Sequence, residues 1–311
     1  MYRELQERPE SVGAGWREFF SDYRPAPGRS VPPPPAPPSR AAAEAPPSPA
    51  VPTDATPILG PARRLVENME TSLGVPTATS VRTLPVKLME ENRSLLNQHL
   101  AEEAGGKVSV THLIAWAMVK ALARHPAMRT VFLAVDGVPH RRALEVVNLG
   151  LAVDVARRDG SRALVVPAVK GAQALSFDRF FAAANDLIRR AQRGQLGPDD
   201  FQDVTVSLTN PGMMGTTHSI ARLMAGQSFI LAAGSIAWPA EYQQADERTL
   251  ARLGVSKVMT LTCTYDHRVI QGADSAAFLR DLTGLLAGEG GFYEEVFASL
   301  EAPHAPLQMA R

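Results

Sequence analysis

A proline-rich stretch divides the chain into parts that must fold separately. Residues 25–57 contain 13 of the 25 prolines, including the run from Pro32 to Pro35. Because proline fixes φ and donates no backbone hydrogen bond, we expect this stretch to be an extended, disordered linker. It separates a short segment, residues 1–24, from residues 58–298, which are predicted to form one globular α/β domain. Residues 299–311 are predicted to be a C-terminal tail.

The N-terminal segment carries aromatic side chains at helical spacing, namely Trp16, Phe19, Phe20 and Tyr23. A segment of this length cannot bury them alone. We interpret it as a docking helix for a partner or another domain, and the linker that follows favours this interpretation. The alternative is a terminal helix that packs on its own globular domain.

Composition excludes several classes of protein. The 32 basic and 32 acidic side chains cancel, which argues against nucleic-acid binding. No apolar run reaches the ~18 residues of a membrane span, and the first residues lack a signal-peptide core. The single cysteine, Cys263, excludes a disulfide framework and a cysteine-based zinc site, and the seven histidines lack metal-ligand spacing. We therefore expect no metal, no membrane, no nucleic acid and a cytoplasmic location. The 27 arginines against 5 lysines, with many Ala, Gly and Pro, indicate a GC-rich bacterial genome.

Within residues 58–298 the apolar pattern alternates between helices and strands. Helices are expected at 61–72, 86–104, 109–125, 176–193 and 273–287, and a further amphipathic helix after Gly291. Strands are expected at 77–85, 146–155, 163–169, 204–209, 228–236 and 258–265, with a hairpin at Asp159-Gly160. In the first helix, Leu65, Val66 and Met69 are expected to point inward. This order favours a mixed sheet with helices on one face.

Two strand ends carry residues with catalytic potential. The segment TCTYDHRVIQG places His267 at a tight turn after a strand, where its imidazole could act as a general base near neutral pH. The segment SLTNPGMMG ends a strand at Thr209, whose hydroxyl could donate to a developing oxyanion. Taken alone, each residue more often has no catalytic role.

Together the two segments resemble the catalytic domain of the 2-oxoacid dehydrogenase acyltransferases. The DHRVI segment is the most specific part, and ARRLVENM, VNLGLAVDV, LVVPAVKGA and SFILAAGSI support it. The resemblance implies an α/β, chloramphenicol acetyltransferase-like two-layer fold. The segment MYRELQERPESVGAGWREFFSDY is similar to the N-terminal segment of 2-oxoglutarate dehydrogenases. With the linker and the acyltransferase part, it resembles the N-terminal part of the actinobacterial multifunctional 2-oxoglutarate dehydrogenases.

The resemblance implies roles for particular residues. His267 would remove the proton from the thiol of coenzyme A or dihydrolipoamide, and Thr209 would stabilise the oxyanion. The site would lie at a trimer interface, with the two residues on neighbouring subunits. Gln271 stands where the family usually has aspartate. Ser256 and Lys257 would lie near the coenzyme A channel.

The resemblance also implies partners and leaves alternatives open. Acyl transfer, with succinyl as the expected group, would need a lipoyl-domain protein, dihydrolipoamide dehydrogenase and a thiamine-dependent decarboxylase. Thiamine diphosphate and magnesium would belong only to that decarboxylase region, which is expected to lie outside residues 1–311. One alternative is a catalytically weak trimeric scaffold that holds the decarboxylase, which Gln271 favours. Another is a detached small-molecule acetyltransferase.

Overall fold

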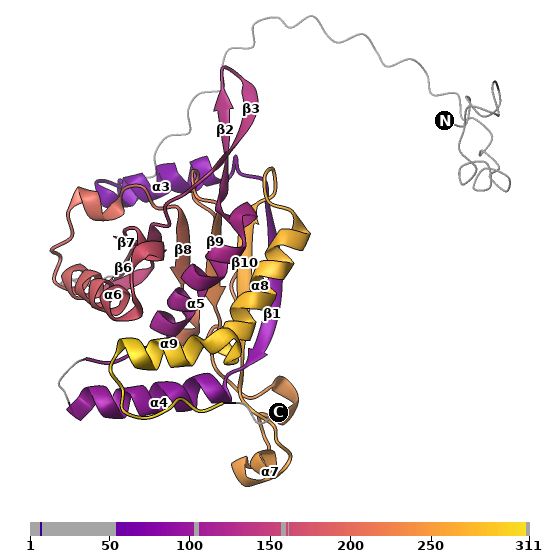
Figure 1. Cartoon of the computed structure of the whole chain (residues 1–311). Helices are drawn as coiled ribbons and strands as arrows, with labels where there is room; N and C mark the ends of the chain where they lie inside the picture. Colours follow the sequence, from indigo (N-terminus) through magenta and orange to yellow (C-terminus); the bar gives the residue numbers. More distant parts are fainter. Residues whose placement is uncertain (1–6, 8–53, 103–105, 157–159, 161, 309–311) are drawn as a thin grey trace, which may run out of the picture. The chain divides into compact units, whose positions relative to one another are not determined.

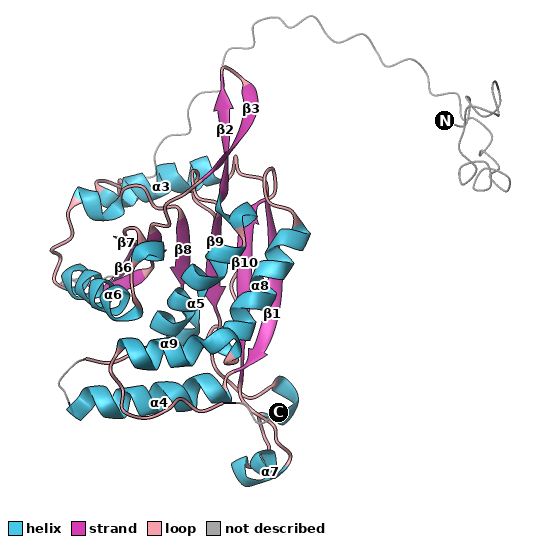
Figure 2. Ribbon diagram, in the orientation of Figure 1, coloured by secondary structure: helices cyan, strands magenta, loops and turns pink. Residues whose placement is uncertain are grey.

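The computed structural model describes residues 7, 54–102, 106–156, 160 and 162–308. The chain divides into two compact units, Met1–Pro57 and Ile58–Arg311. Apart from residue 7, the predicted docking segment lies outside the described residues, as does almost all of the predicted linker. The second unit holds the elements discussed below, which Figures 1 and 2 show along the chain and by type.

Six strands form one mixed sheet in the order β1-β10-β9-β8-β4-β7. Strands β4, β8 and β9 are parallel to one another, whereas β1, β7 and β10 run antiparallel to their neighbours. The strand bounds are β1 Thr77–Pro85, β4 Leu149–Leu151, β7 Ala168–Val169, β8 Val206–Thr209, β9 Phe229–Ala233 and β10 Val258–Asp266. Two separate hairpins pair β2 (Thr130–Val135) with β3 (Val138–Ala143) and β5 (Val153–Ala156) with β6 (Arg162–Val165).

Helices α5 and α8 pack against each other over this sheet (Figure 1). Helix α5 starts with a capping box: the Ser109 hydroxyl accepts from the His112 N–H, and His112 Nδ1 accepts from the Ser109 N–H. Pro126 follows the end of α5. The helix bounds are α3 Pro61–Ser72, α4 Lys87–Glu102, α5 Val110–Arg124, α6 Phe177–Gln192, α7 Glu247–Arg252, α8 Gly272–Leu286 and α9 Phe292–Ser299. None of these described helices is long and apolar enough to cross a membrane.

The two faces of the sheet differ in chemistry. Alternate residues of β10 and β8 join the apolar core under the helices: Met259, Leu261, Cys263, Tyr265, Val206 and Leu208. The residues between them face the other way, because successive side chains of a strand alternate. We call this second side the hydroxyl face; it carries Thr79, Thr83, Ser207, Thr209, Thr260, Thr262 and Thr264. Hydroxyl pairs join β1 to β10 across it, Thr79 with Thr264 and Thr83 with Thr260.

The expected elements form in the expected order, with three corrections. The strand expected at 146–155 is two strands, β4 and β5, which belong to different sheets. The strand expected at 163–169 breaks into β6 and β7, because Pro167 between them has no N–H to continue a ladder. Leu65 and Val66 are not inward: they are 58% and 39% exposed, because they lie on a side of α3 that no described part of the chain covers.

Hairpin β2–β3 has no counterpart in the prediction. Its turn, Asp136-Gly137, has positive φ at both residues, 51° and 77°. An Asp-Gly pair with this geometry is a strong hairpin signal. The hairpin extends beyond the end of the sheet, on the same side as α3 (Figure 1).

Candidate active site

The turn after β10 holds His267 from several directions. Its backbone N–H donates to the Pro76 carbonyl at 2.9 Å. The N–H groups of Val269 and Ile270 donate to the Asp266 carbonyl at 3.2 and 3.0 Å. Asp266 and Ile270 are buried, whereas His267 between them is exposed. The backbone is therefore fixed while the imidazole stays accessible.

The His267 ring has one possible neutral tautomer in this geometry. Its Nδ1 lies 2.9 Å from the Ile270 carbonyl oxygen. Because a carbonyl only accepts, Nδ1 must carry the proton, which leaves the Nε2 lone pair free. The ring also meets Tyr265 edge to face, with centroids 5.6 Å apart. This arrangement presents Nε2 as a base.

Asp266 and Arg268 flank His267 in the chain and form an ion pair with two hydrogen bonds, which we call the fork. Arg268 Nε donates to Asp266 Oδ1 at 2.9 Å and Nη2 donates to Oδ2 at 2.7 Å. The Asp266 side chain is only 5% exposed, so its charge needs this partner. The pair neutralises both charges beside the imidazole.

Thr209 ends β8 on the hydroxyl face. Val206 and Leu208 are in the core, so Thr209 points away from the helices. The next side chain, Asn210, donates to the Thr111 hydroxyl at the start of α5, at 2.9 Å. Thr209 is half-buried, and its loop is anchored to α5.

Two glycines let the backbone after Thr209 fold closely. A Cβ on Gly212 would overlap the backbone of Gly234, and a Cβ on Gly234 would overlap the Thr217 carbonyl. Only glycine fits at these close approaches. The Asn210-Pro211-Gly212 signal therefore serves the packing of the loop against the end of β9.

The structure does not bring Thr209 and His267 together within one chain. Thr209 is level with Ala232 of β9, which is level with Thr262 of β10. His267 lies five residues beyond Thr262, roughly 16 Å along the strand, and two strand spacings, about 10 Å, to the side. One acyl group cannot contact both side chains of a single chain.

Gln271 lies at the start of α8, at the far end of the His267 turn. Its backbone N–H donates to Asp274 Oδ2 at 3.1 Å. The residue is exposed. Its amide is therefore available to a ligand or to the His267 turn.

Ser256 and Lys257 lie at the opposite end of β10 from His267. They line a hollow of about 350 Å³ together with Trp238, and Lys257 Nζ lies 5.6 Å from the Trp238 ring centroid. The same hollow is lined by Lys87 and by three carboxylates, those of Glu90, Glu91 and Glu247, so the carboxylates outnumber the two lysines. This charge balance does not favour the phosphates of a nucleotide.

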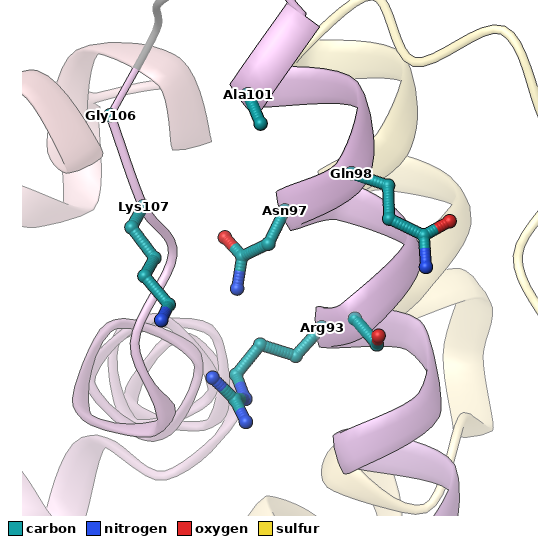
Figure 3. Close-up of a pocket in the computed structure, with 7 residues that line it drawn as sticks. Arg93, Asn97, Gln98, Ala101, Gly106 and Lys107 are labelled. Carbon is teal, nitrogen blue, oxygen red and sulfur yellow. The ribbon is translucent and has the colours of Figure 1, made fainter.

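A second hollow, of about 470 Å³, has the reverse charge balance. It lies between α4 and the segment before α5, and Arg93 and Lys107 point into it from the two sides (Figure 3). No carboxylate of the described residues lines it. Arg93 Nε is buried and has no hydrogen-bond partner among the described residues. We call this hollow the cationic pocket.

Asn97 shapes the cationic pocket by bonding both backbone groups of Val108. Its Nδ2 donates to the Val108 carbonyl at 3.0 Å, and its Oδ1 accepts from the Val108 N–H at 2.8 Å. Sequence reasoning missed this pocket, because Arg93 and Lys107 meet only once the chain folds back along α4. In the part of the chain that the structure describes, no group of three or more His, Cys, Asp or Glu could hold a metal ion.

Solved structures define the class of protein. The Azotobacter vinelandii dihydrolipoamide acetyltransferase aligns with a TM-score of 0.64 and 26% identity, over 82% of this chain and 99% of that one. The truncated catalytic core of the 2-oxoacid dehydrogenase multienzyme complex from Thermoplasma acidophilum aligns with a TM-score of 0.62 and 25% identity, over 76% of this chain and 99% of that one. The predicted two-layer α/β fold with a mixed sheet is confirmed, and it is that of an acyltransferase catalytic core.

The sequence model of the 2-oxoacid dehydrogenases acyltransferase (catalytic domain) matches residues 51–290. The chain therefore belongs to the 2-oxoacid dehydrogenase acyltransferase family and carries its catalytic domain.

Two curated relatives are longer proteins. The multifunctional 2-oxoglutarate metabolism enzyme of Mycolicibacterium vanbaalenii is 43% identical over 99% of this chain and 29% of its own length. The 2-oxoglutarate dehydrogenase E1/E2 component of Corynebacterium glutamicum is 49% identical over 82% of this chain and 21% of its own length. The chain thus spans less than a third of either relative.

Proposed function

We propose that the chain transfers an acyl group between dihydrolipoamide and coenzyme A, with His267 as the general base. The observation that carries this proposal is the contact from His267 Nδ1 to the Ile270 carbonyl, which leaves Nε2 free on an exposed ring. A thiol has a pKa near 8.5, and only its thiolate attacks well. A fixed imidazole can supply that thiolate near neutral pH.

The proposed transfer proceeds by addition of a thiolate to the acyl thioester and collapse of the tetrahedral intermediate. Nε2 of His267 takes the thiol proton, and the sulfur adds to the carbonyl carbon of the acyl thioester. The resulting oxyanion accepts a hydrogen bond from the Thr209 hydroxyl. The intermediate then collapses, the other sulfur leaves, and the proton on Nε2 passes to it. Transfer runs in either direction with the same residues.

A homotrimer is part of this proposal, because His267 and Thr209 lie too far apart in one chain to share an acyl group. An apolar side of α3 that no described residue covers supports it: Leu65 is 58% exposed, and Leu73, directly after the helix, is 65% exposed. Monomeric proteins seldom leave such faces open. A solved relative at 26% identity is described as the cubic core of the pyruvate dehydrogenase multienzyme complex, which also supports a symmetric assembly.

Succinyl is the acyl group we propose, on the strength of the 2-oxoglutarate named in the relatives. The proposed partners are a thiamine-dependent decarboxylase region, a lipoyl-domain protein and dihydrolipoamide dehydrogenase. The name "E1/E2 component" supports the first of these. A bacterial cytoplasmic location belongs to the same proposal, since both relatives are bacterial metabolic enzymes.

The cationic pocket is the better candidate for the phosphates of coenzyme A. Arg93 and Lys107 offer two positive charges with no lining carboxylate among the described residues, and phosphate oxygens match the guanidinium fork. Lys107 directly precedes the segment that caps α5, on which the Thr209 loop rests through Asn210 and Thr111. The predicted residues Ser256 and Lys257 share their hollow with glutamates, so substitution there should matter less.

Gln271 is compatible with activity in this proposal. The description of the Azotobacter vinelandii acetyltransferase names a serine, a histidine and an asparagine in its catalytic mechanism, the last two four residues apart. His267 and Gln271 have the same spacing. An amide at this position therefore has a precedent in a relative, which weakens the scaffold alternative.

The test is thioester exchange from succinyl-CoA to free dihydrolipoamide by the purified chain. We expect turnover by the wild type and a loss of about 10²–10⁴ in kcat for His267→Ala. His304→Ala serves as the matched control, since this histidine is exposed and remote in sequence. Turnover that persists in His267→Ala, or a folded oligomer without turnover, contradicts the proposal. The second result would leave the scaffold function.

A further inference from the structure

An aromatic ring of hairpin β2–β3, that of Phe132, contacts the His267 turn. The guanidinium carbon of Arg268 lies 3.8 Å from the ring centroid of Phe132, in β2. Phe132 is half-buried. Its neighbours Leu133 and Val135 are 38% and 51% exposed. The Phe132 ring is thus one point of contact between this projecting hairpin and the turn.

The contact completes the fixation of the Arg268 side chain. One edge of the guanidinium is bound by Asp266 through two hydrogen bonds of 2.9 and 2.7 Å. Its flat face lies on Phe132. A planar guanidinium can make both contacts at once, and a lysine cannot.

Fixing Arg268 also fixes its neighbour in the chain. Asp266 and Arg268 flank His267, and the Arg268 N–H also donates to Asp266 Oδ1 at 3.1 Å. Rotation of the peptide between His267 and Arg268 would break this small ring of bonds. The direction of the imidazole therefore depends on where the guanidinium is held.

We infer that Phe132 is a positioning residue: it holds Arg268, and through Arg268 it sets the orientation of the His267 imidazole. This inference rests on the proposed role of His267. Phe132 touches neither substrate nor reacting atoms. Its loss should lower kcat and leave the Michaelis constants for both thiol substrates unchanged.

The test compares Phe132→Leu, which keeps an apolar side chain without a π face, with Phe132→Trp, which keeps the π face. We expect Phe132→Leu to lower kcat roughly three- to tenfold with KM constant, and Phe132→Trp to retain activity. Leu133→Ala is the control, because alternation places Leu133 on the other side of β2. It should leave kcat unchanged.

If Phe132→Leu also lowers Tm, a comparison of Arg268→Lys with the double variant Arg268→Lys/Phe132→Leu separates positioning from loss of stability. Arg268→Lys removes the fork, so adding Phe132→Leu to it should cause no further loss of kcat if the ring acts through the guanidinium. Additive losses, or wild-type kcat in Phe132→Leu while His267→Ala is inactive, overturn this inference alone. Turnover that survives His267→Ala would instead overturn the proposed function.

Discussion

The His267 turn and the Thr209 strand end are built in opposite ways. His267 lies outside the ladder: its backbone N–H donates to Pro76, its Nδ1 to the Ile270 carbonyl, and the Asp266–Arg268 ion pair flanks it. Thr209 lies in a regular strand and takes its orientation from the alternation of β8. Bonds within one chain fix both the His267 turn and the Thr209 strand end, but they do not bring the two side chains together.

If His267 and Thr209 have the roles proposed above, this difference divides the catalytic pair between copies of one fold. Because β8 and β10 run in opposite directions, their carboxyl ends lie at opposite ends of the sheet. In the proposed mechanism, a second copy must therefore bring its Thr209 hydroxyl to the His267 imidazole. Helix α3 lies at the same end of the sheet as hairpin β2–β3 (Figure 1), and no described part of the chain covers its apolar side.

The largest effect at the Thr209 end should come from removing its hydroxyl alone. Thr209→Val keeps the branched shape that β8 needs but cannot donate to an oxyanion. We expect kcat to fall by about 10²–10³, as for other single oxyanion donors. Thr209→Ser restores the donor and should recover most of the rate. Equal rates for the valine and serine variants would remove Thr209 from the mechanism.

The stability of the fold should depend on pH through His112, which lies at the start of α5 next to Thr111, the partner of the Thr209 loop. Burial lowers the pKa of His112, at the start of α5, to about 4. The unfolded chain takes up this proton below about pH 6.5, while the folded chain does so only below about pH 4, so stability falls as the pH drops through that window. The loss should reach about 3 kcal/mol.

The measurement is urea unfolding at a series of pH values between 7 and 4. His112→Gln keeps an acceptor for the Ser109 N–H, as in a common capping box, but does not titrate. It should flatten the dependence on pH over this window. A variant curve parallel to the wild type would show that other groups cause the loss.

The smallest effect is expected at Gln271. Its side chain is exposed, its backbone N–H donates to Asp274, and its backbone carbonyl accepts from the Ser275 N–H. We expect Gln271→Asn to stay within about threefold of the wild-type kcat, since a single neutral hydrogen bond is worth only about 0.5–1.5 kcal/mol. Gln271→Ala serves as its partner variant. A loss of two orders of magnitude in Gln271→Asn would place this amide in the rate-limiting step.

Much of the fold could be predicted from periodicity. The helix at α5 was identifiable because Leu113, Ile114 and Met118 recur at helical spacing, and all are buried. The break at Pro167 and the hairpin at Asp136-Gly137 had local signals that the prediction did not use. No local signal predicted that the apolar side of α3 faces outward, because an amphipathic pattern does not show whether that side packs against its own chain or another.

The site was predictable in its residue types and not in its geometry. A histidine between a strand and a turn marked His267 as a candidate base, and that position is observed. The separation from Thr209 depends on strand order and register, which single-sequence patterns do not contain. The cationic pocket depends on Lys107 returning to Arg93 along α4. The catalytic roles themselves remain predictions.

Complementation between inactive chains tests the central claim most directly. Chains carrying His267→Ala and chains carrying Thr209→Val are unfolded together, refolded as mixed oligomers and assayed for thioester exchange. If the two residues act across copies, random mixing gives about a quarter of the interfaces one intact histidine and one intact threonine. We predict activity near that fraction of the wild type, well above either variant alone. Mixed oligomers no more active than the separate variants would contradict a site shared between copies.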